Sequence, residues 1–233
     1  MNILRNKNIK LAVFDMAGTT VQENGIIYNV LYNTLRSFNI DVDKKDIKSW
    51  HGLNKYEVLN KYLTMKEGYC KQCRNNNLEK LKINVHKTFE GNLKLEYFYS
   101  DKLSLMDEQL PELFNKARYK GIKIALNTGY PRDIQKEIIN KLHMNEFIDS
   151  YISSEDVPYS RPYPYMIFNL MEKYKIQSTQ HVIKVGDTTN DILEGLNAGC
   201  YKSIGVLTGA ENKEDLINAG ANIVVDNVKK LIE

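Results

Sequence analysis

The chain alternates between short apolar runs and longer amphipathic segments. Residues 9–14 (IKLAVF) form an apolar run bounded by polar residues, as a buried parallel strand does. Similar runs follow at residues 122–126, 149–153, 181–185, 201–206 and 222–225. Helical spacing predicts helices over residues 106–119, 131–142, 162–175, 188–198 and 212–218. This alternation predicts an α/β fold with a doubly wound parallel sheet.

Residues 26–92 interrupt this alternation, because their apolar residues recur at helical spacing and no strand pattern is convincing. The recurring residues are Val30, Leu31, Leu35, Phe38, Val58, Leu59, Tyr62, Leu63, Leu78, Leu81, Val85 and Phe89. We therefore expect an all-helical cap domain at residues 23–94, inserted into a core domain made of residues 1–22 and 95–233. The polar turn VQENG would lead out of the core, and the segment GNLKLEYFYSD would be the return linker.

Composition narrows the class of protein. The net charge of +3 comes from 32 basic and 29 acidic residues without a basic stripe, so we expect no nucleic-acid partner. A modest basic bias suits an anionic small molecule. No apolar run is long enough to cross a bilayer and no signal segment opens the chain, so we expect a cytoplasmic protein without a membrane partner.

The three cysteines do not suggest a disulfide framework, since their number is odd and no secretion signal precedes them. Cys70 and Cys73 form one CxxC within a polar stretch, and no second pair lies at metal-binding distance. We expect this segment to connect two helices, rather than to hold zinc or carry redox chemistry.

Reactive residue types follow four of the predicted strands: Asp15, then Thr128, then Arg161, and finally Asp187 with Asp191. Singly, each has an ordinary explanation as a helix cap, a turn residue or a solvated side chain. In an open α/β sheet, however, ligands bind at the carboxyl ends of the strands. Their joint occurrence therefore predicts one active site.

These residues resemble the four motifs of the haloacid dehalogenase superfamily, in the stretches DMAGTT, NTGY, SRPYP and GDTTND. The resemblance implies that Asp15 attacks phosphorus and becomes an aspartyl phosphate. It also implies that Thr128 and Arg161 bind the transferring group, while the Gly18 backbone and the Thr19 hydroxyl approach it. The cofactor implied is Mg²⁺, held by oxygen ligands from Asp15, the Ala17 carbonyl and Asp187, with Asp191 close by.

Ala17 departs from the pattern of most phosphatases of this superfamily, which place a second acid there to protonate the leaving oxygen. Losing such a group typically costs 10²–10⁴-fold in rate. Alanine here is instead a feature of the phosphonoacetaldehyde hydrolase branch, which cleaves a carbon–phosphorus bond through an imine with a cap lysine. HGLNK (residues 51–55) resembles the MGLLK of that branch, which places Lys55 on the imine-forming lysine and Gly52 beside the substrate.

Two positions differ from this branch: Val58 stands where it has a histidine, and His51 stands where it has a methionine. If one helix runs through both His51 and Lys55, they share a face and the imidazole could serve the amine. Lys55 could also be an ordinary surface lysine, since GxxK occurs in relatives of unsettled substrate. Gly129 and Tyr130, which follow Thr128, could face the substrate, although Tyr130 could equally pack on the next helix.

We therefore expect a Mg²⁺-dependent hydrolase that cleaves the carbon–phosphorus bond of phosphonoacetaldehyde or a similar carbonyl phosphonate. The alternative is a phosphatase acting on a small phosphate monoester, and a third reading is a phosphate-binding protein without catalysis. Val30, Leu31 and Tyr32 could support a homodimer through the cap, but burial in the core explains them equally.

Overall fold

The computed structural model describes residues 6–69, 76–99 and 102–232. The predictions for Cys70 and Cys73 therefore lie outside the described residues. Within these ranges, no helix combines the length and the apolar character that crossing a bilayer requires.

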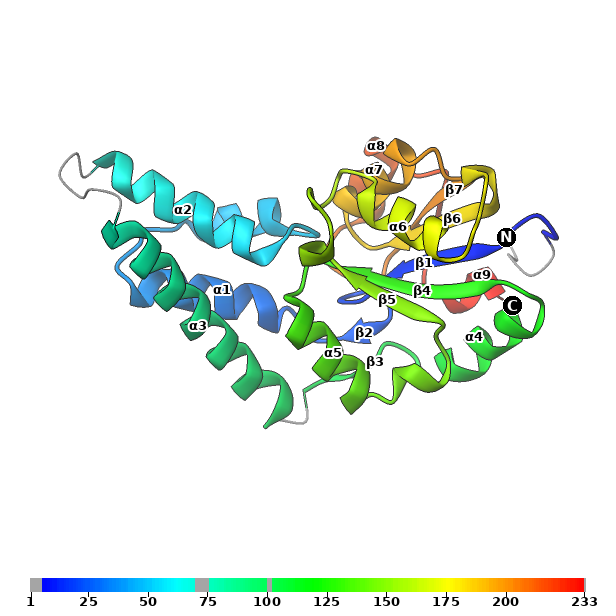
Figure 1. Cartoon of the computed structure of the whole chain (residues 1–233), viewed down its shortest axis with the longest axis horizontal. Helices are drawn as coiled ribbons and strands as arrows, with labels where there is room; N and C mark the ends of the chain where they lie inside the picture. The colour runs from blue at the N-terminus through cyan, green and yellow to red at the C-terminus, as the bar shows by residue number, and fades with distance from the viewer. Residues whose placement is uncertain (1–5, 70–75, 100–101, 233) are drawn as a thin grey trace.

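A six-stranded sheet, parallel throughout, forms the centre of the core (Figure 1). In spatial order its strands are β5 (Ser150–Ser153), β4 (Lys123–Thr128), β1 (Leu11–Asp15), β6 (Val182–Gly186), β7 (Lys202–Val206) and β8 (Ile223–Val225). The chain adds β4 and β5 on one side of β1 and then crosses to add β6, β7 and β8 on the other. This order confirms the predicted doubly wound sheet and places its switch point at β1.

Both faces of the sheet are covered by helices, which explains why its strands read as continuous apolar runs. Ala12 and Phe14 of β1 pack with α4 (Leu110–Tyr119), α5 (Arg132–Lys141) and α9 (Lys229–Ile232). Leu11 and Val13 point the other way and pack with α6 (Tyr165–Lys173). The helices α7 (Thr189–Asn197) and α8 (Lys213–Asn218) follow β6 and β7.

Two of the predicted helices start later than the pattern suggests. Helix α6 begins at Tyr165 rather than near residue 162, because a residue that precedes a proline, as Tyr163 precedes Pro164, is disfavoured in the helical conformation. Helix α4 begins at Leu110 rather than at residue 106, with Pro111 in its first turn, where a missing amide proton costs nothing.

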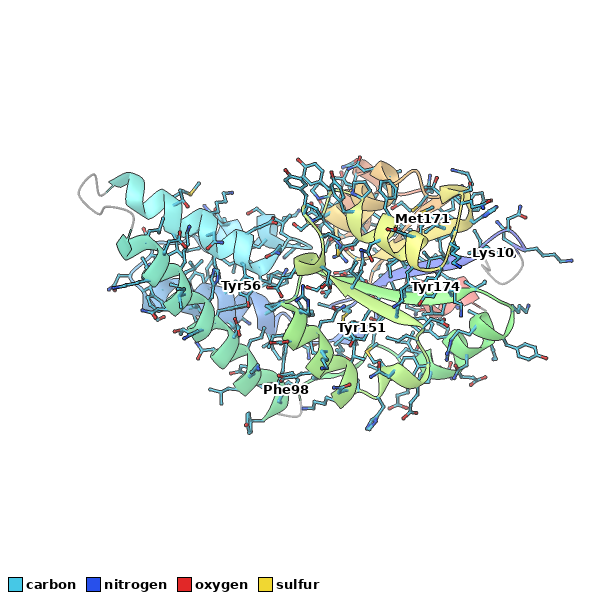
Figure 2. All side chains as sticks on the ribbon, viewed as in Figure 1. Lys10, Tyr56, Phe98, Tyr151, Met171 and Tyr174 are labelled. Carbon is cyan, nitrogen blue, oxygen red and sulfur yellow. The ribbon has the colours of Figure 1, made fainter. Side chains whose placement is uncertain are left out.

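We call residues 26–98 the helical cap; its described part consists of three α-helices and a short 3₁₀ segment and extends away from the sheet (Figure 1). These elements are α1 (Ile26–Ser37), the 3₁₀ segment Lys44–Trp50, α2 (Lys55–Tyr69) and α3 (Asn76–Phe98). Side chains fill the space between the helices (Figure 2): the ring of Tyr56 on α2 stacks on that of His86 on α3, with centroids 4.4 Å apart. The exact domain bounds stay a prediction.

The return linker predicted at residues 91–101 is wrong for most of its length, because α3 continues to Phe98. Val85, Phe89, Leu93 and Tyr97 are spaced four residues apart and are all fully buried, so one apolar stripe carries the helix onward. The sequence pattern also did not predict a small antiparallel pair of strands at the base of the cap. These are β2 (Val21–Gln22) and β3 (Ser104–Leu105).

Candidate active site

Two neighbouring strands bring the predicted carboxylates to one edge of the sheet. Strand β1 ends at Asp15, and β6, its neighbour, is followed by Asp187. Asp191 lies in the first turn of α7. Each of the three offers an oxygen within 4.8 Å of those of the other two, and all three side chains are buried. The sheet therefore brings together carboxylates that are up to 176 residues apart in the sequence.

The tight turn after β1 brings the backbone against Asp187. Gly18 has a φ of +82°, and a Cβ atom there would lie 2.5 Å from Asp187 Oδ2. Only glycine combines this conformation with this close approach. The Thr19 hydroxyl donates to Asp187 Oδ1 at 2.9 Å, so in this structure it orients a carboxylate rather than facing a substrate.

Asp191 is held by the helix that carries it. Its side chain and the Thr188 hydroxyl form a capping box, with the Thr188 hydroxyl 2.5 Å from Asp191 Oδ2. The other oxygen, Oδ1, lies 3.0 Å from Arg161 and 2.8 Å from Lys184. Asp191 is therefore a fixed negative charge behind the other two carboxylates.

Arg161 is buried and lies at the centre of this charge network. Its Nη1 atom is 2.7 Å from Asp15 Oδ1, its Nε atom is 3.1 Å from Glu194, and its Nη2 atom donates to Asn127. Lys184 on β6 is equally buried and donates to the same asparagine at 2.7 Å. Sequence reasoning missed Asn127, Lys184 and Glu194, although a lysine inside an apolar strand is a signal that could have found one of them.

The pKa values of the carboxylates reflect this crowding. Burial, then the charge of Asp191, raise the pKa of Asp15 to about 6, against the opposing effect of Arg161. Burial and the charge of Asp15 raise the pKa of Asp187 well above its ordinary value. For Asp191, burial acts upward, but Arg161 and Lys184 hold the pKa below its ordinary value.

This donor set fits a small, hard cation. In the described part of the chain, Asp15, Asp191 and Glu194 form ion pairs with Arg161 and Lys184, and Asp187 forms none. The candidate ligands are all oxygens, as Mg²⁺ prefers. A divalent cation bound by Asp15 and Asp187 would offset the excess negative charge that raises their pKa values.

A loop of the cap, residues 51–54, docks on the core and is called the docking loop below. In this loop, the His51 carbonyl accepts a hydrogen bond from Asn190 Nδ2 (2.7 Å), and Asn54 Nδ2 donates to Ser154 Oγ (2.9 Å). The next residue, Lys55, donates its amide proton to the Gly129 carbonyl (3.2 Å). Gly52 has a φ of +70°, and a Cβ there would lie 2.5 Å from Thr188 Oγ1. The cap is therefore closed on the core in this structure.

Lys55, at the first position of α2, is buried rather than on the surface, with 5% of its area exposed. Burial lowers the pKa of its amine to about 8; the charge of Asp15 acts against this, and that of Arg161 adds to it. Its Nζ atom donates to the Leu53 carbonyl at 2.9 Å and lies 5.1 Å from the centre of the Tyr28 ring. The amine is thus desolvated next to the carboxylate network.

His51 does not share a helix with Lys55, because α2 begins at Lys55 and His51 lies in the docking loop. The premise that the two side chains lie on one helical face is therefore wrong. The His51 ring instead packs on Tyr28, with centroids 4.8 Å apart, and its Nδ1 atom lies 3.7 Å from Glu211 of the core. Sequence reasoning identified neither Tyr28 nor Glu211.

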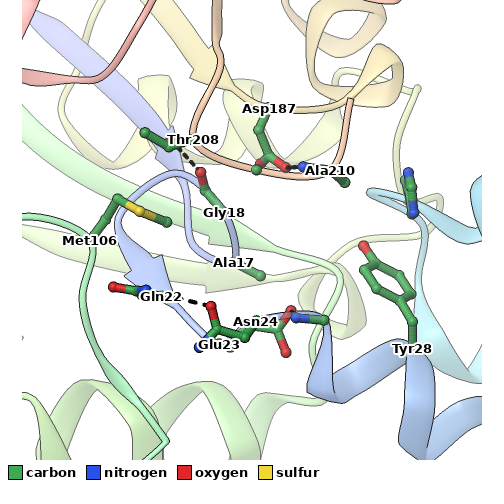
Figure 3. Close-up of a pocket in the computed structure, with 13 residues that line it drawn as sticks. Ala17, Gly18, Gln22, Glu23, Asn24, Tyr28, Met106, Asp187, Thr208 and Ala210 are labelled. Carbon is green, nitrogen blue, oxygen red and sulfur yellow. Dashed lines mark hydrogen bonds between the residues drawn. The ribbon is translucent and has the colours of Figure 1, made fainter. Parts of the chain in front are cut away.

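A cavity of about 360 Å³ opens beside the nucleophile, between the start of α1 and the core (Figure 3). Predicted site residues line part of it: Ala17, Gly18, His51 and Asp187. The other lining residues are Gln22, Glu23, Asn24, Gly25, Tyr28, Met106, Thr208, Gly209 and Ala210. Tyr28 projects into the cavity in Figure 3, and the Lys55 amine lies 5.1 Å from the centre of its ring.

In this closed structure, the side chains of Thr128 and Tyr130 make hydrogen bonds within the protein. The Thr128 hydroxyl accepts the amide proton of Tyr130 at 3.2 Å, and both side chains are buried. The Tyr130 hydroxyl lies 3.0 Å from that of Tyr97 at the end of α3. Between them, Gly129 leaves room for the Leu53 carbonyl of the docking loop, which a Cβ would overlap.

Buried carboxylates suited to a cation at the carboxyl ends of the strands, and a helical cap on a doubly wound sheet, are features of one class of hydrolases. The family model for haloacid dehalogenase-like hydrolases matches residues 9–199, and the chain belongs to this family. It is accordingly an enzyme of the hydrolase class.

Two proteins of similar sequence are named phosphonoacetaldehyde hydrolase. The chain is 26% identical to a phosphonoacetaldehyde hydrolase from Bacteroides fragilis, over 97% of this chain and 95% of that one. It is 25% identical to a phosphonoacetaldehyde hydrolase from Bacillus cereus, over 87% and 77%.

Solved structures agree on the fold. A phosphonoacetaldehyde hydrolase-like protein from Oleispira antarctica superposes with a TM-score of 0.76 at 21% identity, over 95% of this chain and 89% of that one. A protein described as a predicted phosphatase, from Clostridium acetobutylicum, gives 0.74 at 21% identity, over 95% of both chains. At these identities the likeness shows the fold alone.

Proposed function

We propose that this hydrolase is Mg²⁺-dependent and cleaves the carbon–phosphorus bond of phosphonoacetaldehyde or a similar carbonyl phosphonate. The observation that carries the proposal is the position of Lys55: an amine buried by the closed cap, next to the carboxylate network, with a pKa lowered to about 8. A lysine that forms an imine must spend time neutral, and burial favours that form.

Lys55 and Asp15 then share the chemistry. The Lys55 amine adds to the aldehyde carbon and, with loss of water, forms a protonated imine. The Asp15 carboxylate attacks phosphorus, and the electron pair of the carbon–phosphorus bond moves into the imine to give an enamine and an aspartyl phosphate. Water hydrolyses the aspartyl phosphate to phosphate, and protonation and hydrolysis of the enamine release the aldehyde and the free amine.

Other residues support these steps. Arg161, 2.7 Å from Asp15, would neutralise charge on the phosphoryl oxygens, and the Thr128 hydroxyl at the end of β4 would donate a hydrogen bond to one of them. Mg²⁺, held by Asp15, Asp187 and the Ala17 carbonyl with Asp191 nearby, would supply positive charge to the transferring group. The enamine is a leaving group that needs no acid at position 17, which suits Ala17.

The second candidate is a phosphatase for small phosphate monoesters, and the cavity favours it. Its volume of about 360 Å³ exceeds what a two-carbon aldehyde fills, and its polar wall of Gln22 and Asn24 could bind a larger leaving group. Lys55 would then only bind the substrate. Against this, Ala17 offers no acid to the leaving oxygen, so ester hydrolysis would depend on a good leaving group.

Borohydride reduction in the presence of phosphonoacetaldehyde separates the two candidates. We expect a stable adduct whose mass maps to Lys55, and its absence would remove the imine mechanism. A panel of phosphonates and phosphate esters, assayed with Mg²⁺ and with EDTA, measures which bond is cleaved and whether the cation is required.

A further inference from the structure

A chain of buried hydrogen bonds joins the cap to the core at the base of the cap. The Tyr97 hydroxyl donates to Glu23 Oε2 at 2.8 Å and lies 3.0 Å from the Tyr130 hydroxyl. Because the single proton of Tyr97 goes to Glu23, Tyr130 must donate its own proton to Tyr97. The three residues are at most 5% exposed. We call Glu23, Tyr97 and Tyr130 the hinge chain.

The three members come from the three segments that meet where the chain passes between core and cap. Glu23 lies between β2 and α1, where the chain leaves the core, and Tyr97 lies in the last turn of α3, where it returns. Tyr130 follows Thr128 and Gly129, the loop after β4 that we assign to the phosphoryl group. The hinge chain therefore connects both segments that link the core to the cap with the loop after β4.

Glu23 also fixes the first turn of α1. Its Oε1 atom accepts the Gly25 amide at 3.1 Å, and its Oε2 atom accepts the Ile27 amide at 2.9 Å. A carboxylate is a favourable partner for the unpaired amides at a helix N-terminus. Tyr97, at the end of α3, thus bonds to Glu23, the residue that also holds the start of α1 in place.

The loop after β4 is held by the cap at a second point. The Lys55 amide donates to the Gly129 carbonyl at 3.2 Å, one residue before Tyr130. The two attachments come from the start of α2 and the end of α3, so the position of this loop and the seating of the cap depend on each other. The described hydrogen bonds of the Tyr97 hydroxyl are to Glu23 and Tyr130, and neither residue belongs to the carboxylate network.

We propose that Tyr97 is a positioning residue: its hydroxyl fixes the angle at which the cap meets the core, so that Lys55 is seated on Gly129 above the nucleophile. The catalytic consequence rests on the proposed function, but the seating of the cap does not. Without the hydroxyl, Tyr130 and Glu23 lose their shared partner, and the cap closes less completely.

The experiment compares Tyr97→Phe with Tyr62→Phe in the full-length chain. Tyr62 is a matched control, because its hydroxyl also makes two hydrogen bonds, to Asp46 (2.8 Å) and from Trp50 (3.2 Å), but both stay inside the cap. Hydrogen exchange of the Lys55 amide is the first measurement, since its partner, Gly129, belongs to the core. Turnover of the substrate from the panel above is the second.

For Tyr97→Phe we expect the Lys55 amide to exchange about fivefold to tenfold faster, as loss of a buried hydrogen bond implies, and kcat to fall by a similar factor. Tyr62→Phe should lower the melting temperature without changing either quantity. If both variants change the exchange of this amide equally, the proposal is overturned.

A second variant protects the test if Tyr97→Phe does not fold. Tyr130→Phe removes the end of the hinge chain but leaves the bond between Tyr97 and Glu23, and it should speed exchange of the Lys55 amide less than Tyr97→Phe does. Unchanged exchange in Tyr130→Phe would contradict the coupling. If the enzyme cleaves no substrate of the panel, the proposed function fails while the exchange measurement still decides the role of Tyr97.

Discussion

The two halves of the active site are held in different ways. On the core side, Arg161 bonds to Asp15, Asp191, Glu194 and Asn127, so several buried partners fix this arginine. On the cap side, the described hydrogen bond of the Lys55 amine is to Leu53, in the docking loop next to it. The core half is fixed by the sheet, whereas the cap half is in place only when the docking loop is seated.

This difference separates phosphoryl transfer from chemistry at a carbonyl group. In the proposed mechanism, phosphoryl transfer to Asp15 would depend on groups that the sheet holds whether or not the cap is closed. Chemistry at a carbonyl would depend on Lys55, and therefore on cap closure, which is the usual role of a mobile lid. Changes in the core should affect every substrate, and changes in the cap should affect one class more than the other.

The largest effect is expected for Asp15→Asn, which replaces the nucleophile by a similar uncharged group. Turnover of phosphonates and esters should both fall, on the order of 10⁴-fold or more, because no covalent intermediate can form. Steady-state assays of the purified variant measure this, with circular dichroism to show that it folds. Residual activity near that of the native chain would exclude Asp15 as the nucleophile.

Lys55→Arg should give the clearest difference between the contributions of the core half and the cap half of the active site. Arginine keeps the positive charge but cannot become a neutral amine, so carbon–phosphorus cleavage should be lost, by roughly 10³-fold or more. Slow hydrolysis of an activated aryl phosphate should remain, because it needs only the core residues. Phosphate release from both substrates is the measurement, and equal loss of the two activities would contradict the division.

Gly52→Val tests whether docking of the cap matters apart from Lys55. The positive φ and the overlap of a Cβ with Thr188 disfavour the seated loop, and strain of this kind costs about 1–3 kcal/mol. We expect carbon–phosphorus cleavage to fall by about tenfold to a hundredfold. Gly91→Ala is the control, because this helical glycine has nothing within 4 Å of an added Cβ; a comparable loss there would show that the effect is not specific to docking.

The smallest effect is a pH dependence. Burial lowers the pKa of Lys55 to about 8, so the amine is mostly protonated below that pH and mostly neutral above it. The kcat/KM for carbon–phosphorus cleavage should therefore rise as the pH increases, about tenfold per unit below pH 8, and level off above. The kcat/KM for aryl phosphate hydrolysis should not show this rise. A rise with both substrates would assign the titration to a group other than Lys55.

Much of the fold could be predicted, because its signals are local. The six sheet strands lie within two residues of the predicted runs, since buried parallel strands are continuous apolar stretches bounded by polar residues. The end of α3 was missed because GNLKLEYFYSD looks polar, although Leu93 and Tyr97 continue the buried stripe. Strands β2 and β3 are too short to leave a pattern, and they form only because the two crossings of the chain meet.

The candidate site divides in the same way. Asp15, Asp187 and Asp191 come together as expected, because each follows a strand and parallel strands end at one edge of a sheet. Asn127 and Glu194 could not be inferred as partners of Arg161, nor Lys184 as a partner of Asp191, since such buried pairs depend on distances between residues far apart in the sequence. The relation of His51 to Lys55 was wrong, because the helix starts at Lys55 itself.

The amino-acid order alone thus determined the strand ends, the reactive residue types on them and the alanine beside the nucleophile, because these are properties of short segments. Only the tertiary structure decided that Lys55 is buried rather than solvated, that Tyr28 and Glu211 surround His51, and that Tyr97 ties the cap to the core. Burial and pairing arise when separate segments pack together, and no local pattern records which segments will meet.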